Sequence, residues 1–144
     1  MGSIQDKVGR IAEKDVEKLF SNYGYWALLV QKGPNGQPFD LIAIKEKENK
    51  VYKWFVDVKH LRGKVASFTF DRIEANQLTS MKYARSFAGI KDNLGFVIAL
   101  DLGESRYLYL PYDKLIEMKE KGLKSVKIAD LENFEELLYA YSNK

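Results

Sequence analysis

The sequence predicts an α/β fold, in which a mixed sheet of about five strands is flanked by helices. Two segments, about 5–22 and about 71–87, repeat apolar residues at the three- and four-residue spacing of an amphipathic helix. Short apolar runs rich in β-branched and aromatic residues, the pattern of buried strands, come between and after these segments. The runs cover residues 25–30, 39–45, 51–59, 94–100 and 107–110.

The first half of the chain predicts a helix followed by three strands. The helix is expected to end at Asn22-Tyr23-Gly24, and the apolar run 25–30 that follows is expected to be a buried strand. "QKGPNGQP" (31–38) holds two glycines and two prolines, which is typical of a loop. The polar stretch "EKENK" (46–50) indicates a turn, so the strands on either side of it should form an antiparallel hairpin.

The second half predicts a helix, two strands and two short helices. Asp71 is a plausible N-terminal cap for the helix over 71–87. The last two strands flank "DLGES", and residues 112–121 and 130–141 have the spacing of short helices.

The composition is that of an ordinary globular protein of 144 residues, and we expect a single domain over residues 1–144. The net charge of +3 is only mildly basic, so a phosphate-binding face has to come from local clustering of lysine and arginine. The absence of cysteine excludes thiol catalysis, and the single histidine, His60, excludes a histidine triad or zinc cluster. No apolar run approaches the ~20 residues that span a bilayer. We therefore expect a cytoplasmic protein with no membrane partner.

A charged pair interrupts the second hairpin strand. Asp57 and Lys59 stand two residues apart, so their side chains should point to the same face of the sheet, and Asp40 should come close to Asp57 across the hairpin. Neighbouring carboxylates repel unless a cation neutralises them, and Mg²⁺ often uses only one or two protein carboxylates. The backbone carbonyl of Val58 is a further candidate ligand. Lys59 could hold a water or stabilise charge on a phosphate oxygen, which makes this a constellation for phosphodiester hydrolysis.

The acid-x-Lys pattern is weakly specific by itself, because it occurs three times, at Asp57-Val-Lys59, Glu48-Asn-Lys50 and Glu117-Met-Lys119. Only the first lies on an apolar strand with another acid one hairpin away. A plain salt bridge between Asp57 and Lys59 at the end of a strand explains the hairpin residues as well as a metal site does.

Longer segments resemble known nucleases. "PFDLIAI…VYKWFVDVKH" resembles the core of the PD-(D/E)xK nucleases, with Pro38-Phe39-Asp40 as the first element and Asp57-x-Lys59 as the second. "SFTFDRIEANQLTSMKYARSFAGIKDNLGFVIALDLGESRYLYLPYDKL" looks like the RecU-type Holliday junction resolvases, and "VGRIAEKDVEKLFSNYGY" is similar to the first helix of archaeal and RecU-type resolvases. The resemblance covers residues 8–118 and implies a restriction-endonuclease-like fold.

The resemblance also implies site residues outside the hairpin. Glu13, four residues after Gly9, takes the place of the catalytic acid of the first helix, and Gln77 takes the place of a glutamine that supports Lys59 or the attacking water. Helical periodicity alone favours Asp15 as the inward acid, because Glu13 lies at the edge of the apolar stripe. Without the resemblance, all three would be ordinary solvated helix residues.

Two features depart from the RecU pattern. RecU proteins carry Glu where this chain has Asp57, although the superfamily accepts either acid. They also carry a long stalk between their first two strands, where this chain has only the loop 31–38. The short connection leaves junction selectivity open. The small size resembles phage-encoded and archaeal versions of the fold.

The resemblance implies a structure-selective endodeoxyribonuclease that resolves four-way junctions as a homodimer. Its cofactor would be Mg²⁺, or Mn²⁺ in its place, held by Glu13, Asp40, Asp57 and the Val58 carbonyl, with Lys59 orienting the water. A restriction-like or repair nuclease acting on duplex or flaps, and an inactive DNA-binding module, are the alternatives. The candidate DNA contacts are Lys32, Arg62 and Lys64, for which solvation at the surface is the default explanation.

Overall fold

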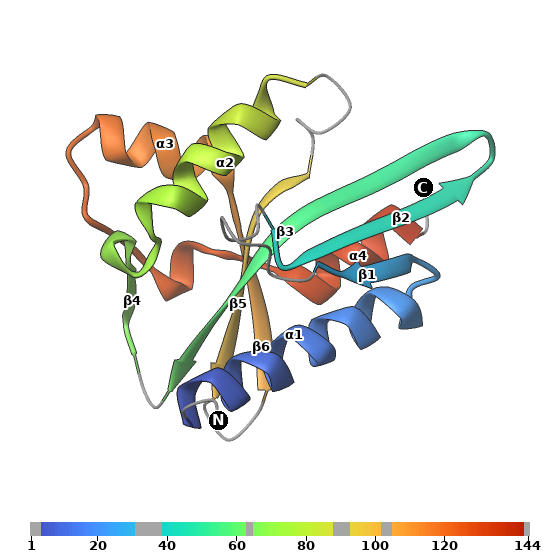
Figure 1. Cartoon of the computed structure of the whole chain (residues 1–144), viewed down its shortest axis with the longest axis horizontal. Helices are drawn as coiled ribbons and strands as arrows, with labels where there is room; N and C mark the ends of the chain where they lie inside the picture. Colours follow the sequence, from blue (N-terminus) through green and yellow to red (C-terminus); the bar gives the residue numbers. More distant parts are fainter. Residues whose placement is uncertain (1–3, 31–38, 63–64, 88–92, 102–104, 143–144) are drawn as a thin grey trace.

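The structure is a computed structural model of the chain, and it describes residues 4–30, 39–62, 65–87, 93–101 and 105–142. Six strands form a central sheet in the order β1-β2-β3-β5-β6-β8, with helices on both faces (Figure 1). β3 and β5 run parallel, and every other neighbouring pair in this sheet is antiparallel. The predicted α/β fold with a mixed sheet is therefore confirmed.

The elements follow one another along the chain as two halves. The first half contains α1 (Ile4–Asn22), β1 (Trp26–Leu29), β2 (Leu41–Lys47), β3 (Lys50–Arg62), β4 (Ser67–Thr69), the 3-10 helix η1 (Phe70–Arg72) and α2 (Ala75–Arg85). The second half contains β5 (Leu94–Asp101), β6 (Ser105–Pro111), α3 (Tyr112–Glu120), β7 (Ser125–Lys127), the 3-10 helix η2 (Ile128–Asp130), β8 (Glu132–Asn133) and α4 (Phe134–Ser142).

The sheet separates two apolar cores. On one face, α1 and α4 pack against the strands through aromatic side chains: Phe20 and Trp54 lie 5.3 Å and 5.6 Å from the ring of Phe134, measured between ring centroids. On the other face, α2 and α3 bury Met81 and Leu115 completely. Burial of these side chains on both faces holds the sheet in place and supplies most of the stabilising free energy.

The predicted hairpin is confirmed. β2 and β3 pair antiparallel along their shared length, with Leu41 opposite Val56. The turn itself is only two residues long, since Glu48 and Asn49, both at positive φ (51° and 66°), connect the strands directly. Positive φ at both central residues is the geometry of the tight hairpin turn whose twist matches that of the strands. This turn fixes the register on which the position of the acidic residues depends.

The predicted burial of the first strand is wrong. β1 lies at the edge of the sheet, where Trp26 and Leu28 are 61% and 48% exposed. They alternate with Ala27 and Leu29, which are half-buried against the α1 core. The apolar run 25–30 misled because hydrophobicity shows that a side chain is apolar, and not which neighbour covers it.

The second helix begins later than predicted. Phe70–Arg72 form η1, and α2 starts at Ala75 after the N-cap Glu74. Asp71 is not the cap, because Glu74 and Gln77 form the reciprocal hydrogen bonds of a capping box. The new start places Gln77 in the first turn of α2, at the end that faces β3.

Several short elements were missing from the prediction. β4, β7 and β8 contain three, three and two residues, too few to show a period of two. β8 brings the main sheet to six strands instead of about five, and β4 pairs with β7 in a small second sheet. The helix predicted over 130–141 begins only at Phe134, because the short elements η2 and β8 occupy the residues before it. The loop predicted over 31–38 lies outside the described residues, and no described helix is long and apolar enough to cross a membrane.

From about its middle to its C-terminal end, β3 has no neighbouring strand on one side among the described residues. β2 pairs with β3 only as far as Val56, whereas β5 follows β3 to its end. From Asp57 onward, the described residues provide no strand on the β2 side. Val56 directs its carbonyl to this side, where it accepts a hydrogen bond from the N–H of Asp40. Because alternate residues of a strand direct their amide groups to the same side, Val58 and His60 face the open edge.

Candidate active site

The two predicted acids meet where the hairpin ends. Asp40 directly precedes β2, and its N–H donates to the carbonyl of Val56 at 3.0 Å, although Leu41 is the residue of β2 that pairs with Val56. Asp40 therefore lies beside the end of this pairing, where its carboxyl adjoins that of Asp57. Both side chains belong to residues that are almost fully buried, with exposed fractions of 8% for Asp40 and 2% for Asp57. The expectation that the hairpin brings these carboxylates together is confirmed.

Asp40 also completes the backbone at the open edge. Its Oδ2 accepts a hydrogen bond from the N–H of Val58 at 2.7 Å, in the place where a further β2 residue would have accepted it. The carbonyl of Val58 is directed to the same edge. The carboxyl group of Asp40 and the Val58 carbonyl therefore lie on the side of β3 that no strand of the described chain covers.

The surroundings of Asp57 disfavour the charged form of its carboxyl. Burial raises the pKa of its carboxyl well above the usual range, the adjoining Asp40 raises it further, and Lys59 opposes both effects. The Nζ of Lys59 is 3.5 Å from Oδ2 of Asp57, close enough for an ion pair, yet Oδ2 has no hydrogen-bond partner among the described residues. The salt bridge that competed with the metal site is thus present, but it leaves one buried acid oxygen unsatisfied and a second carboxyl beside it.

Lys59 is held by two side chains. Besides its contact with Asp57, its Nζ donates to Oε1 of Gln77 at 2.8 Å. The same Oε1 accepts the backbone N–H of Glu74 at 3.1 Å, so Gln77 joins the capping box of α2 to the strand. The Lys59 side chain is only 14% exposed. The structure therefore brings Gln77 to Lys59, where the sequence resemblance had placed it.

Glu13 and Asp15 lie on opposite flanks of the buried stripe of α1. They are separated by about 200° around the helix. Asp15 is exposed and its Oδ2 accepts the hydroxyl of Tyr107 on β6 at 3.3 Å, two strands away from β3. Burial and this carboxylate raise the pKa of Tyr107 to about 12, so its hydroxyl stays protonated as the donor. The half-buried Glu13 lies on the other flank, away from β6.

The fit of a divalent cation rests on the carboxyl pair. In the described part of the chain, no group of three or more His, Asp or Glu side chains is placed to share a metal ion, so Glu13 is not gathered with Asp40 and Asp57. The pair by itself fits Mg²⁺, which is commonly bound by one or two carboxylates and keeps several waters. The unsatisfied Oδ2 of Asp57 and its raised pKa both indicate a site that lacks positive charge.

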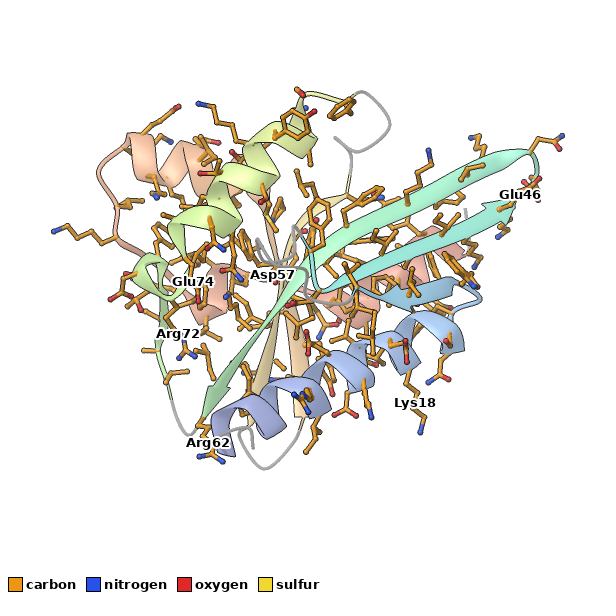
Figure 2. All side chains as sticks on the ribbon, in the orientation of Figure 1. Lys18, Glu46, Asp57, Arg62, Arg72 and Glu74 are labelled. Atoms are coloured by element: carbon orange, nitrogen blue, oxygen red, sulfur yellow. The ribbon has the colours of Figure 1, made fainter. Side chains whose placement is uncertain are left out.

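The predicted DNA contacts are only partly described. Arg62 is exposed at the last residue of β3, whereas Lys32 and Lys64 lie outside the described residues. In Figure 2, Glu74, Arg72 and Arg62 follow one another from beside the centre of the molecule to its lower edge, and Asp57 lies nearer the centre. Sequence reasoning missed Arg72, whose Nη2 donates to the carbonyl of His60 at 2.9 Å. No sequence signal reveals it, because a contact to a backbone carbonyl leaves no residue pattern.

The arrangement can be compared with known proteins. No protein-family model matches the sequence, and no curated protein matches it. Among solved structures, the chain is similar to Hjc of Archaeoglobus fulgidus, described as a Holliday junction resolvase from an archaeal hyperthermophile. The match covers 90% of this chain and 99% of that chain, with 21% identity and a TM-score of 0.57. This chain has the fold of Hjc.

The likeness to Hjc confirms the predicted restriction-endonuclease-like fold. The likeness is to an archaeal protein, and it gives no support to the narrower RecU-type assignment. The RecU assignment rested on the order of short motifs after β3. Short motifs of this kind reflect local structure, and they distinguish poorly between families that share a fold.

Proposed function

We propose that this chain is a metal-dependent, structure-selective endodeoxyribonuclease that resolves Holliday junctions by paired phosphodiester hydrolysis. The observation that carries the proposal is the buried pair Asp40 and Asp57, with Lys59 alongside, at the open edge of β3. A buried acid with an unsatisfied oxygen is costly for stability and is expected at a site with a function. The Hjc-like fold is consistent with this chemistry.

Asp40, Asp57 and the Val58 carbonyl would hold Mg²⁺, or Mn²⁺ in its place, and Glu13 is the proposed acid from α1. When bound, the ion supplies Lewis-acid stabilisation of phosphate charge and acidifies a water ligand. The residues do the rest. Lys59, fixed by Gln77, orients the nucleophilic water and stabilises the charge that develops on the phosphate oxygens.

The proposed reaction is an in-line hydrolysis. The oxygen of water forms a bond to phosphorus while the bond from phosphorus to the 3′ oxygen breaks. The products are a 5′-phosphate and a 3′-hydroxyl that takes up a proton. The 2.8 Å hydrogen bond between Lys59 and Gln77 matters here, because a preorganised lysine needs no rearrangement when the charge develops.

Paired cutting requires two active sites, and the proposed homodimer supplies the second. One face of the hairpin offers a surface for it. Trp26, Leu28 and Val51 are 61%, 48% and 54% exposed, and the strand alternation places them on the same face as the half-buried Ile42 and Phe55. The hairpin projects beyond the helices that cover the rest of the sheet (Figure 1). An apolar surface of this kind on a soluble chain marks an interaction site.

The charges on this face favour a second copy as its occupant. Glu46 and Lys53 lie on the same face near the tip of the hairpin, one acid and one base. A two-fold axis brings each surface against itself, so Glu46 of one copy can meet Lys53 of the other at both ends of the interface. The face is thus complementary to itself in charge as well as in apolar character.

A cleavage assay tests the catalytic proposal. A labelled four-way junction and a linear duplex of the same sequence are incubated with the protein in Mg²⁺, in Mn²⁺ and in chelator. We expect cutting of the junction that requires the metal and is lost in Asp57→Asn, while binding of the junction persists. Equal cutting of the duplex would favour a restriction-like or repair nuclease, and binding without any cutting would favour an inactive DNA-binding module.

Light scattering after gel filtration tests the dimer. We expect Trp26→Glu to convert a dimer into a folded monomer, because it buries a charge at the proposed interface. Leu123→Glu is the matched control, since Leu123 is 50% exposed elsewhere on the chain. On a cruciform in a closed circular DNA, the dimer should release linear product and the monomer nicked circles. A wild-type monomer that still produces linear DNA would contradict the proposed interface.

A further inference from the structure

The open edge of β3 is capped by two side chains from outside the sheet. Oδ2 of Asp40 accepts the N–H of Val58, and Nη2 of Arg72 donates to the carbonyl of His60 at 2.9 Å. Both caps occupy the side of β3 from which β2 is absent. The guanidinium of Arg72 therefore lies two residues along the same edge from the carboxyl pair.

Arg72 has a charge that no carboxylate of the described residues neutralises, and it has unused hydrogen-bond donors. It is exposed, and within the described residues its only hydrogen bond is the one to His60, with no carboxylate at ion-pair distance. A guanidinium offers five N–H donors in a planar fork, so four remain. Arg85 shows the contrast, because its Nε and Nη2 donate to both carboxylate oxygens of Asp113, at 2.8 Å and 3.0 Å.

The position of Arg72 is fixed from both ends. Its neighbour Phe70 is buried in the core beneath α2, and the capping box of Glu74 and Gln77 starts two residues later. The hydrogen bond to His60 then holds the guanidinium itself. An arginine held in this way loses little further side-chain entropy when it binds a ligand.

We propose that Arg72 binds a phosphate of the substrate strand beside the scissile phosphate. The segment from η1 to the first turn of α2 would then contribute two residues to the site: Gln77, which holds Lys59, and Arg72, which contacts the DNA backbone. This inference rests on the proposed function. Val58 and His60 are separated by about 7 Å along the strand. Neighbouring phosphates of one DNA strand can therefore reach both positions. Figure 2 places Arg72 between Glu74 and Arg62, with Asp57 nearer the centre of the molecule.

The test measures the binding of the full-length chain to a fluorescent four-way junction in chelator, from about 50 to about 200 mM salt. Arg72→Gln should weaken binding roughly fivefold and flatten the salt dependence by about one unit of log–log slope, because one fewer counterion is released. Arg72→Lys keeps the charge and should restore the slope. Arg106→Gln is the matched control, since Arg106 is exposed on β6, two strands from β3.

Cleavage and melting separate the possible outcomes. With Mg²⁺ and saturating protein, Arg72→Gln should cut at a rate within about twofold of the wild type, since the lost contact contributes to binding. If Arg72→Gln and Arg72→Lys both melt at lower temperatures while the salt dependence of DNA binding is unchanged, Arg72 only caps β3, and the inference is overturned. An unchanged slope without loss of stability would overturn it as well. Absence of DNA binding by the wild type would instead overturn the proposed function, and this inference with it.

Discussion

The Nζ of Lys59 and Oε1 of Gln77 form a 2.8 Å hydrogen bond between the central strand β3 and the first turn of α2. The same oxygen accepts the N–H of Glu74, so the lysine of the candidate site is positioned by the cap of a helix. Lys59 also contacts Asp57 at 3.5 Å, and it thus connects the acid pair to α2.

Gln77→Ala should lower the rate of cleavage more than it lowers affinity for DNA. Without Oε1, Lys59 loses the partner that holds it in place, and charge that develops in the transition state is stabilised less well. We expect a roughly tenfold slower single-turnover rate, an effect of about 1.4 kcal/mol. Thr79→Ala on the exposed side of the same helix should leave the rate unchanged. If Gln77→Ala weakens binding while the rate at saturation stays the same, Gln77 supports the DNA interface instead.

Asp57 should make the stability of the metal-free protein depend on pH. Its folded-state pKa is raised above the unfolded value of about 3.9 by burial and by Asp40. Between these two pKa values the folded chain keeps a proton that the unfolded chain has lost, so the free energy of unfolding falls as the pH rises through this window. In chelator at pH 7, Asp57→Asn should therefore melt at a higher temperature than the wild type.

Thermal melts from about pH 4 to pH 8 check this prediction, because the advantage of the variant should shrink toward the unfolded pKa of Asp57. Added Mg²⁺ should raise the melting temperature of the wild type and have little effect on Asp57→Asn, since a ligand that binds only the folded state stabilises it. A variant that melts below the wild type at neutral pH in chelator would show that the carboxylate of Asp57 is already compensated.

The two acids of the first helix should differ in function. Glu13→Gln should reduce cleavage strongly, because Glu13 is the acid that the proposed function assigns to α1. Asp15→Asn should leave cleavage intact, and Asn keeps an oxygen that can accept the hydroxyl of Tyr107. Tyr107→Phe removes this hydrogen bond and should lower the stability slightly. Rates and melting temperatures of the three variants decide the matter. Loss of activity in Asp15→Asn alone would show that periodicity identified the right acid.

Gly95→Ala should destabilise the fold by about 1–3 kcal/mol, because there is no room at this position for a side chain. An added Cβ would lie 2.4 Å from the carbonyl oxygen of Leu110 and 2.9 Å from the hydroxyl of Tyr109. Leu123→Ala, at a surface site, is the control and should change stability by less than about 0.5 kcal/mol. Urea unfolding measures both. An unaltered midpoint for Gly95→Ala would mean that β5 and β6 can move apart at this point.

The sequence predicted the parts of the fold and site that depend on local pattern. Asp40, Asp57 and Lys59 could be placed because a hairpin with a short polar turn has few possible registers, and the observed one brings the two acids together where the pairing of β2 with β3 ends. Gln77 was placed by the resemblance, and its hydrogen bond to Lys59 agrees with that placement. The helix at the start of the chain was predicted nearly to its last residue, since its apolar stripe is long.

Tertiary structure decided what no local pattern records. The exposure of Trp26 depends on β1 lying at the edge of the sheet, and the tether between Arg72 and His60 depends on β2 ending before β3 does. The raised pKa of Asp57 likewise reflects how deeply the folded chain buries it beside Asp40. By itself the sequence determined which side chains can share a strand face or a helix stripe, because those periods follow from backbone geometry. The packing of elements distant in the sequence decided which strand edges remain unpaired. It also decided which charged groups are buried away from water.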